Sequence, residues 1–214
     1  MRMIDLTHTI KENMPVYPGT LSPALRAAST VEKDGFKETL LSMFSHTGTH
    51  IDAPAHLFAG KTTLDAFPVS QFAGKALVID CRGLADGAAI TMAQLAPYGA
   101  KVKQADFLLF CLGWDKKWGT PAYFENYPCL GEDVMSLILD GDYKGIGFDA
   151  ISLDPIADTA LTRHKQLLDK KEIINIENLC RLDECGSELF AFACLPLKYE
   201  NADGAPARAI GWVE

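Results

Sequence analysis

The sequence predicts an α/β protein, because short apolar segments typical of strands alternate along the chain with amphipathic segments typical of helices. The segments that predict strands are residues 38–44, 76–81, 106–112, 145–151, 172–178 and 189–199. The segments that predict helices are residues 91–99, 131–142 and 158–171. No Ser-rich or Gly-rich linker and no internal repeat divides the chain, so we expect a single domain over residues 1–214.

Each helical segment carries a signal at one of its ends. Thr91 is a candidate N-cap for the first, Gly141 ends the apolar face of the second, and Asp158 opens the third. The strand segments are short runs rich in aliphatic and aromatic residues. The first seventy residues are rich in Pro and Gly, and we expect them to form strands and long loops laid over the core.

Composition excludes several classes of partner. The chain has 28 acidic against 20 basic residues and a net charge of -8, without a basic run that could neutralise several phosphates, so we expect no nucleic-acid partner. No segment is apolar enough for a secretory signal or a membrane span. The six cysteines form no CxxC pair, so we expect a cytoplasmic protein with buried thiols. A chain of this length does not need a metal in order to fold, so a metal would serve chemistry.

Three of the five histidines lie in the segment HTGTHIDAPAH, residues 46–56. Gly48 and Pro54 disfavour a helix here, and in an extended chain His46, His50 and Asp52 project to the same side. A straight strand would separate the Cα atoms of His46 and His50 by about 13 Å, so we expect a bend at Gly48. Two imidazoles and a carboxylate suit Zn²⁺, Mn²⁺ or Fe²⁺. The alternative is a solvated loop whose polar side chains only cap backbone amides.

Taken together, these residues resemble the signature HxGTHxDxPxH of the cyclase family of metal-dependent hydrolases, which includes kynurenine formamidase (arylformamidase) and isatin hydrolase. Other segments are similar to the family along nearly the whole chain, among them DLTHTI, GFDAISLDP, HKQLLDKKEIINIENL and LPLKYENADGAPARAI. The resemblance implies a swivelling β/β/α fold with mixed sheets and flanking helices. The metal ligands that it implies are His46, His50, Asp52, His164 and Glu177.

The resemblance further implies that His56 is the general acid and base and that Asp52 can bridge two ions. We therefore expect hydrolysis of a small aryl amide, as in arylformamidase, by hydroxide formed on the metal, with His56 delivering a proton to the leaving nitrogen. We expect one or two divalent ions per chain, zinc first and manganese as the alternative. From spacing alone His56 could equally be a third ligand. The alternative functions are hydrolysis of a cyclic amide, as in isatin hydrolase, and metal binding without catalysis.

Aromatic residues are the candidates for the walls that bind a small-molecule substrate. Tyr17 lies between two prolines, where its ring would be held rigidly, although the formamidase branch tends to carry tryptophan at this place. Trp114 and Trp118 could line the site, but packing in the core or at a subunit contact is the better interpretation. Cys111 ends an apolar run and is expected to be an inert thiol, and His8 is expected to be structural. The resemblance also implies a homo-oligomer, a dimer or a tetramer, with residues 114–124 as a candidate interface.

Overall fold

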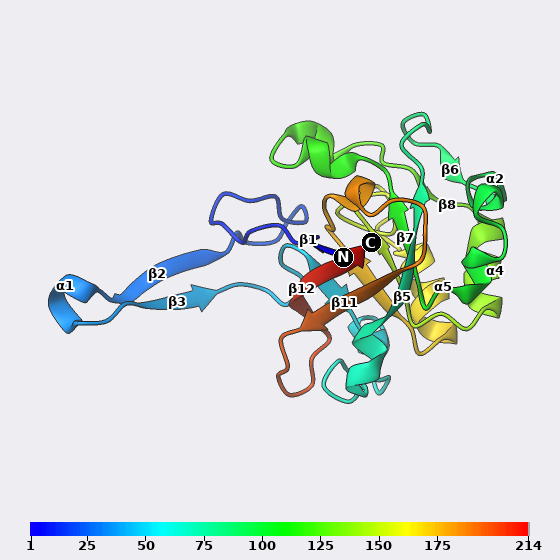
Figure 1. Ribbon diagram of the computed structural model, residues 1–214. Coiled ribbons are helices and arrows are strands. Elements are labelled where there is room, and N and C mark those ends of the chain that lie inside the picture. The colour runs from blue at the N-terminus through cyan, green and yellow to red at the C-terminus, as the bar shows by residue number, and fades with distance from the viewer. Residues whose placement is uncertain (214) are drawn as a thin grey trace.

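The computed structural model describes residues 1–213. They contain twelve strands and five α-helices, and eight of the strands form one large mixed sheet (Figure 1). The strands are β1 (Arg2–Asp5), β2 (Ala24–Ser29), β3 (Glu38–Ser42), β4 (His50–Asp52), β5 (Ala73–Asp80), β6 (Ala89–Ile90), β7 (Phe107–Cys111), β8 (Cys129–Leu130), β9 (Gly145–Phe148), β10 (Ile174–Glu177), β11 (Phe190–Pro196) and β12 (Gly204–Val213). The α-helices are α1 (Val31–Asp34), α2 (Met92–Leu95), α3 (Lys101–Gln104), α4 (Glu132–Asp140) and α5 (Thr162–Lys170).

The large sheet closes into a barrel. Its strand order is β1-β12-β11-β5-β7-β9-β10-β4, and β4 also pairs with β12, so the seven strands from β12 to β4 form a closed ring and β1 is added to β12. β5, β7, β9 and β10 run parallel, and the other pairings in this sheet are antiparallel. β4 therefore lies between β10 and β12, and the histidine segment is built into the wall of the barrel.

Two apolar clusters hold the barrel and its helices together, and the alternation of strand side chains separates them. In β7, Phe107 and Leu109 belong to the cluster enclosed by the barrel, whereas Leu108 and Phe110 belong to the cluster under the helices. α4 and α5 add side chains to the second cluster and flank the barrel on one side (Figure 1). Every residue of β7 is buried, which explains why its sequence is an unbroken apolar run.

The α/β class with flanking helices is confirmed, and all six expected strands occur. Thr91 caps α2, with Gln94 completing a capping box, and Gly141 caps α4. The first expected helix is shorter than residues 91–99, because a 3-10 turn over Ala96–Tyr98 replaces its second half. The apolar runs give no bounds for the other six strands, β1, β2, β4, β6, β8 and β12, although the sequence predicts strands somewhere in the first seventy residues. The inward side chains of β12 include Ala205, Ala207 and Ala209, and alanine gives little strand signal.

The expectation that the first seventy residues lie over the core is wrong for β2 and β3. These two strands pair with each other in a separate antiparallel sheet and project away from the barrel as a hairpin, with α1 at the tip (Figure 1). All five residues of β3 are exposed. The strand signal of residues 38–44 therefore marks a surface element.

The six cysteines are buried, as the sequence indicates. Burial, the largest cause, raises the pKa of the Cys111 thiol, so this residue suits a packing role. Among residues 1–213, no helix has both the length and the apolar character needed to cross a membrane.

Candidate metal centre

The pairing of β4 with β10 builds the floor of a cavity of about 410 Å³. In this antiparallel register His50 lies opposite Glu177 and Asp52 lies opposite Asn175. Side chains two residues apart on a strand share a face, so these four polar groups meet on one side of the barrel wall. Ile51 and its partner Ile176 point the other way, into the apolar cluster enclosed by the barrel.

Gly48 provides the bend that the sequence requires. Its φ of 68° lies in the left-handed region, and the turn places Nδ1 of His46 at 2.7 Å from Oδ1 of Asp52. The imidazole rings of His46 and His50 are consequently 5.2 Å apart between centroids. On the other side of His46, Gly204 begins β12 and leaves no room for a Cβ beside the ring. A larger residue at position 204 would displace His46.

His164 reaches the same floor from α5. Its Nε2 lies 3.1 Å from Oε1 of Glu177 and 3.5 Å from Oδ2 of Asp52. Nε2 of His50 lies 3.3 Å from Oδ1 of Asp52 and 3.6 Å from Oε2 of Glu177. The structure thus brings together all five side chains that the resemblance implies as ligands. They form two groups of three that share one carboxylate: His46 with His50 and Asp52, and Asp52 with His164 and Glu177.

Neighbouring groups fix the orientation of the two deepest imidazoles. Nδ1 of His50 lies 2.8 Å from the carbonyl oxygen of Gly48, which can only accept, so this nitrogen carries the proton and Nε2 presents its lone pair to the carboxylates. Nδ1 of His164 faces Oδ2 of Asp154 at 2.8 Å in the same way. A partner on the far ring nitrogen is typical of histidines that bind metals.

An amide and a phenol extend this support. Asn178 donates from Nδ2 to the Gly48 carbonyl at 2.8 Å, and its Oδ1 accepts from the hydroxyl of Tyr123 at 2.7 Å. Asn175 donates from its amide nitrogen to Oδ2 of Asp52 and to Oε1 of Glu177, both at 2.9 Å. The floor is therefore held by hydrogen bonds from buried side chains.

His56 lies at the rim of the cavity, on a 3-10 turn over Pro54–His56. Its ring packs against His46 with centroids 4.0 Å apart, and its Nδ1 lies 3.9 Å from Oδ2 of Asp203. The same carboxylate oxygen is 3.0 Å from Nε2 of His46. Within the described residues, His56 makes no ion pair with Asp52 or Glu177, which separates it from the deeper group.

The electrostatics of the floor favour positive charge. Burial opposes a charge on His46, but its hydrogen bonds to Asp203 and Asp52 outweigh burial and raise the pKa of the imidazole to about 10. The pKa of His164 is raised well above its ordinary value for the same reason, against burial, by Asp154, Asp52 and Glu177. Burial alone would raise the pKa of Asp52, yet the three imidazoles around it hold that pKa well below the ordinary value.

A divalent cation fits this donor set. Buried carboxylates require a cation or several hydrogen-bond donors, and Asp52 and Glu177 share one small volume with three imidazole nitrogens. Nitrogen and oxygen donors in this mixture suit zinc, manganese and iron. Burial, the largest cause, also lowers the pKa of His56 below its ordinary value, which favours the neutral imidazole.

Of the aromatic residues considered for the substrate walls, only Tyr17 lines the cavity. Tyr17 lines it, together with Phe44 and Leu161. Trp114 is buried in the cluster under the helices, so part of the candidate interface at residues 114–124 is internal. Trp118 stacks on His8 with ring centroids 3.8 Å apart, and neither residue lines the cavity.

Sequence reasoning missed Asp154, Asn175, Asn178 and Asp203. Asp154 and Asp203 stand in the segments GFDAISLDP and LPLKYENADGAPARAI, which carry the resemblance, but nothing in their spacing connects them to the histidines. Asn175 and Asn178 flank Glu177 in the segment EIINIEN, and this spacing is the one signal that could have been used.

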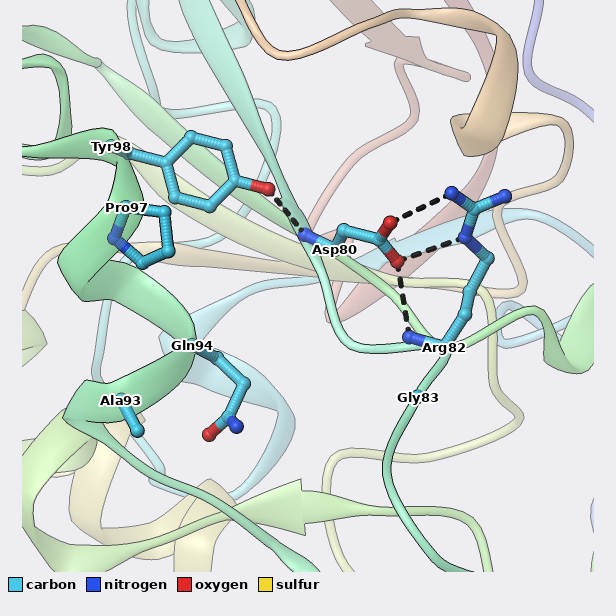
Figure 2. Close-up of a pocket in the computed structure, with 7 residues that line it drawn as sticks. All are labelled: Asp80, Arg82, Gly83, Ala93, Gln94, Pro97 and Tyr98. Atoms are coloured by element: carbon cyan, nitrogen blue, oxygen red, sulfur yellow. Dashed lines mark hydrogen bonds and ion pairs between the residues drawn. The ribbon is translucent and has the colours of Figure 1, made fainter.

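A larger hollow of about 580 Å³ lies near the end of β5 and does not have these properties (Figure 2). Its two charged groups satisfy each other, because Arg82 donates to both carboxylate oxygens of Asp80, at 2.8 and 2.7 Å. The hydroxyl of Tyr98 accepts from the backbone amide of Asp80 at 2.8 Å. The cavity at the histidines remains the candidate site.

A family model described as "Putative cyclase" matches residues 4–155, which is more than half of the chain. The chain belongs to this family. This cyclase-family protein is 31% identical over 209 residues to the kynurenine formamidase of Bacillus cereus, with 97% of this chain and 95% of the relative covered. The resemblance stated from the sequence is therefore confirmed.

Solved structures agree on the fold. Isatin hydrolase A from Labrenzia aggregata, bound to benzyl benzoate, is 23% identical with a TM-score of 0.87, over 99% of this chain and 93% of that one, which shows the fold alone. A protein from Bacillus stearothermophilus described as a predicted metal-dependent hydrolase is 28% identical with a TM-score of 0.74, over 98% and 97% of the two chains.

Proposed function

We propose that this cyclase-family protein is a metal-dependent hydrolase of a small aryl amide, an arylformamidase that acts on N-formylkynurenine or a close analogue. The observation that carries the proposal is the pair of donor groups sharing Asp52 at the floor of a cavity. The identity with a kynurenine formamidase over nearly the full length of both chains supports the choice of amide.

We propose His46, His50, Asp52, His164 and Glu177 as the metal ligands. Because Asp52 belongs to both groups of donors, the five side chains could hold one ion or two. Zinc is the first choice, and manganese is the alternative, because both accept nitrogen and oxygen donors. Such a cation polarises a carbonyl oxygen and lowers the pKa of water near it, and amide hydrolysis needs both effects.

His56 is the proposed general acid and base. It stands at the rim beside the ligands, and its neutral imidazole can take a proton from the attacking water and give it to the amide nitrogen. The C–N bond then breaks, the carbonyl carbon leaves as a carboxylic acid and the nitrogen leaves as an amine. Oδ2 of Asp203 lies 3.9 Å from Nδ1 of His56, close enough to favour the imidazolium that forms when the ring takes up the proton.

The wall opposite the donors is proposed to bind the aryl group. Tyr17, Phe44 and Leu161 offer aromatic and aliphatic surface to a flat ring, and Tyr17 is half-buried. A second candidate substrate is a cyclic amide such as isatin. The observation that favours it is the tyrosine at position 17, where the formamidase branch tends to carry tryptophan.

Hydrolysis of N-formylkynurenine and of isatin by the metal-reconstituted protein tests both substrates. We expect a higher kcat/KM for N-formylkynurenine than for isatin. Faster turnover of isatin would move the protein to the cyclic-amide class. A metal-loaded protein inactive on a panel of amides, lactams and lactones would show a binding protein that lacks catalysis.

We further propose that the enzyme is a homo-oligomer, a dimer or a tetramer, and that it works in the cytoplasm. Its six buried cysteines are unpaired, which is typical of a reducing compartment.

A further inference from the structure

Leu161, the residue directly before α5, has a backbone conformation that leucine rarely adopts. Its φ of 55° and ψ of 52° lie in the left-handed region, where the Cβ of an L-residue comes too close to the following carbonyl oxygen. Among residues 1–213, five residues other than glycine have a positive φ, and three of them are asparagines, which tolerate this region. The fourth is Arg181, whose guanidinium binds the carboxylate of Glu184. Leu161 is the one of the five whose side chain is apolar.

Packing in the core does not account for this conformation. Leu161 is half-buried and belongs to neither apolar cluster, whereas Leu167 and Leu168 of α5 are fully buried in the cluster under the helices. Tyr17, which also lines the cavity, packs against that cluster. A glycine at position 161 would form the same turn without strain and without the loss of a core contact. The role of the leucine side chain therefore lies outside the core.

Hydrogen bonds on both sides of Leu161 hold the left-handed turn. The amide of Leu161 donates to the carbonyl oxygen of Asp158 at 3.2 Å, and its own carbonyl oxygen accepts from the amide of Lys165 at 2.9 Å. The carboxylate of Asp158 accepts from the amides of Ala160 and Thr162, at 3.0 and 3.3 Å. The backbone rather than side-chain packing therefore sets the position of the leucine side chain.

This side chain lines the cavity that contains the proposed metal ligands. His164 follows Leu161 by three residues, in the first turn of α5, and its Nε2 reaches Glu177 at the floor. One short segment thus supplies both an apolar group of the wall and a donor of the floor, and the helix fixes the spacing between them. An aliphatic group held in this way limits how an aromatic ring can lie beside the reacting atoms.

We propose that Leu161 is a specificity-determining residue, which makes the cavity prefer amides of a single benzene ring to amides of a larger aryl group such as naphthalene. The strained backbone is retained because it holds the leucine against the substrate. Strain of this kind clusters at functional sites, where the surrounding structure enforces an unfavourable conformation. The inference rests on the hydrolase function proposed above and narrows its substrate class.

Hydrolysis of formanilide and of N-(1-naphthyl)formamide by the metal-loaded full chain tests the proposal. In Leu161→Ala, the ratio of kcat/KM for formanilide to that for the naphthyl compound should fall at least about tenfold, the effect of removing apolar groups from a pocket. The matched control is Leu137→Ala, which removes the same atoms from a half-buried leucine on α4 that does not line the cavity. The control should keep the ratio of the wild type. An unchanged ratio in Leu161→Ala, or an equal fall in the control, would overturn the proposal.

Unfolding in denaturant tests the strain without any substrate. Leu161→Gly and Leu161→Ala both lack the side chain, but only glycine fits the left-handed backbone freely. The equilibrium constant for unfolding should be about threefold smaller for the glycine variant, after allowance for the freedom of glycine in the unfolded chain. Its substrate preference should match that of the alanine variant. A glycine variant less stable than the alanine variant would show that position 161 is unstrained and would contradict the proposal.

Failure of the hydrolase function would be a separate result. If the metal-loaded wild type hydrolyses neither formamide, that function fails, and the dissociation constants of the two compounds, measured by calorimetry, take the place of kcat/KM. The preference for formanilide in binding should then fall at least about tenfold in Leu161→Ala and stay unchanged in Leu137→Ala. Equal preferences in the two variants, or no binding of either compound to the wild type, would overturn the inference about Leu161.

Discussion

The floor and the rim of the cavity are built differently. At the floor, the side chains of His50, Asp52, His164 and Glu177 are 2–6% exposed. At the rim, the side chains of His56 and Asp203 are 27% and 44% exposed. The floor is fixed by strand pairing and buried hydrogen bonds, and the rim follows a short turn and the start of β12. The difference teaches that holding an ion and moving a proton belong to separate parts of the site and should be separable by experiment.

Removal of the ion should have the largest effect. Dialysis against a chelator should abolish hydrolysis, because the floor would lose the group that activates water. The apolar clusters contain none of the five proposed ligands, so the fold should persist. Activity assays and circular dichroism on the same sample would check this. Global unfolding on chelation would mean that the ion holds the structure, as in small metal-dependent domains.

A substitution at the rim should affect turnover and spare the ion. In His56→Ala, turnover should fall at least about a hundredfold, which is the lower end of the contribution of a positioned acid or base. Metal content per chain should stay close to that of the wild type, because His56 forms no ion pair with Asp52 or Glu177 and belongs to a separate group of donors at the rim, with His46 and Asp203. Loss of metal from this variant would make His56 a ligand.

A substitution that weakens the support of the floor should lower metal affinity, and its effect should be smaller than that of His56→Ala on turnover. Tyr123→Phe removes the hydroxyl that orients Asn178, and through it the Gly48 carbonyl that fixes the tautomer of His50. Metal affinity should weaken about tenfold, the low end for a group that supports a ligand. A competition titration with a chromophoric chelator measures it without substrate.

Tyr143→Phe is the matched control for that titration. Tyr143 is also buried, but its hydroxyl donates to the backbone carbonyl of Val102, and neither residue lines the cavity. Its loss should leave metal affinity unchanged. Equal effects of the two substitutions would show a general loss of stability and would remove Tyr123 from the support of the floor.

The smallest effect is expected from Tyr17, which lines the wall of the cavity, and it should be on substrate binding. In Tyr17→Ala, KM should rise several-fold with metal content unchanged, because the ring contacts substrate in both the ground state and the transition state. Tyr17→Phe should retain most of the binding if the flat ring is what matters. A fall in kcat with KM unchanged would instead place Tyr17 in the chemistry.

The sequence predicted the floor better than its surroundings. The parity of His46, His50 and Asp52 and the bend at Gly48 are local properties, and the structure has both. His164 and Glu177 came from the resemblance alone, because only the pairing of β4 with β10 and the position of α5 bring them close. Asp203 could not be found from spacing, because β12 reaches the site through closure of the barrel.

The same contrast holds for the fold. Apolar runs predicted β7 and β9, since strands buried on both faces have no polar alternation to obscure them. In β10 the alternation of Ile174 and Ile176 with Asn175 and Glu177 separates the apolar face from the face that lines the site. The strand signal at residues 38–44 is just as clear, yet β3 is exposed. Local sequence indicates a strand, but its burial depends on which other elements pack against it.

The central claim is that the floor holds a divalent ion. Crystals grown with zinc or manganese and measured on both sides of the metal absorption edge would test it most directly. We predict an anomalous peak between Asp52 and the imidazoles of His46, His50 and His164, and its loss in crystals of Asp52→Asn. Metal-loaded crystals with no peak at Asp52, or a peak that remains in the variant, would contradict the claim.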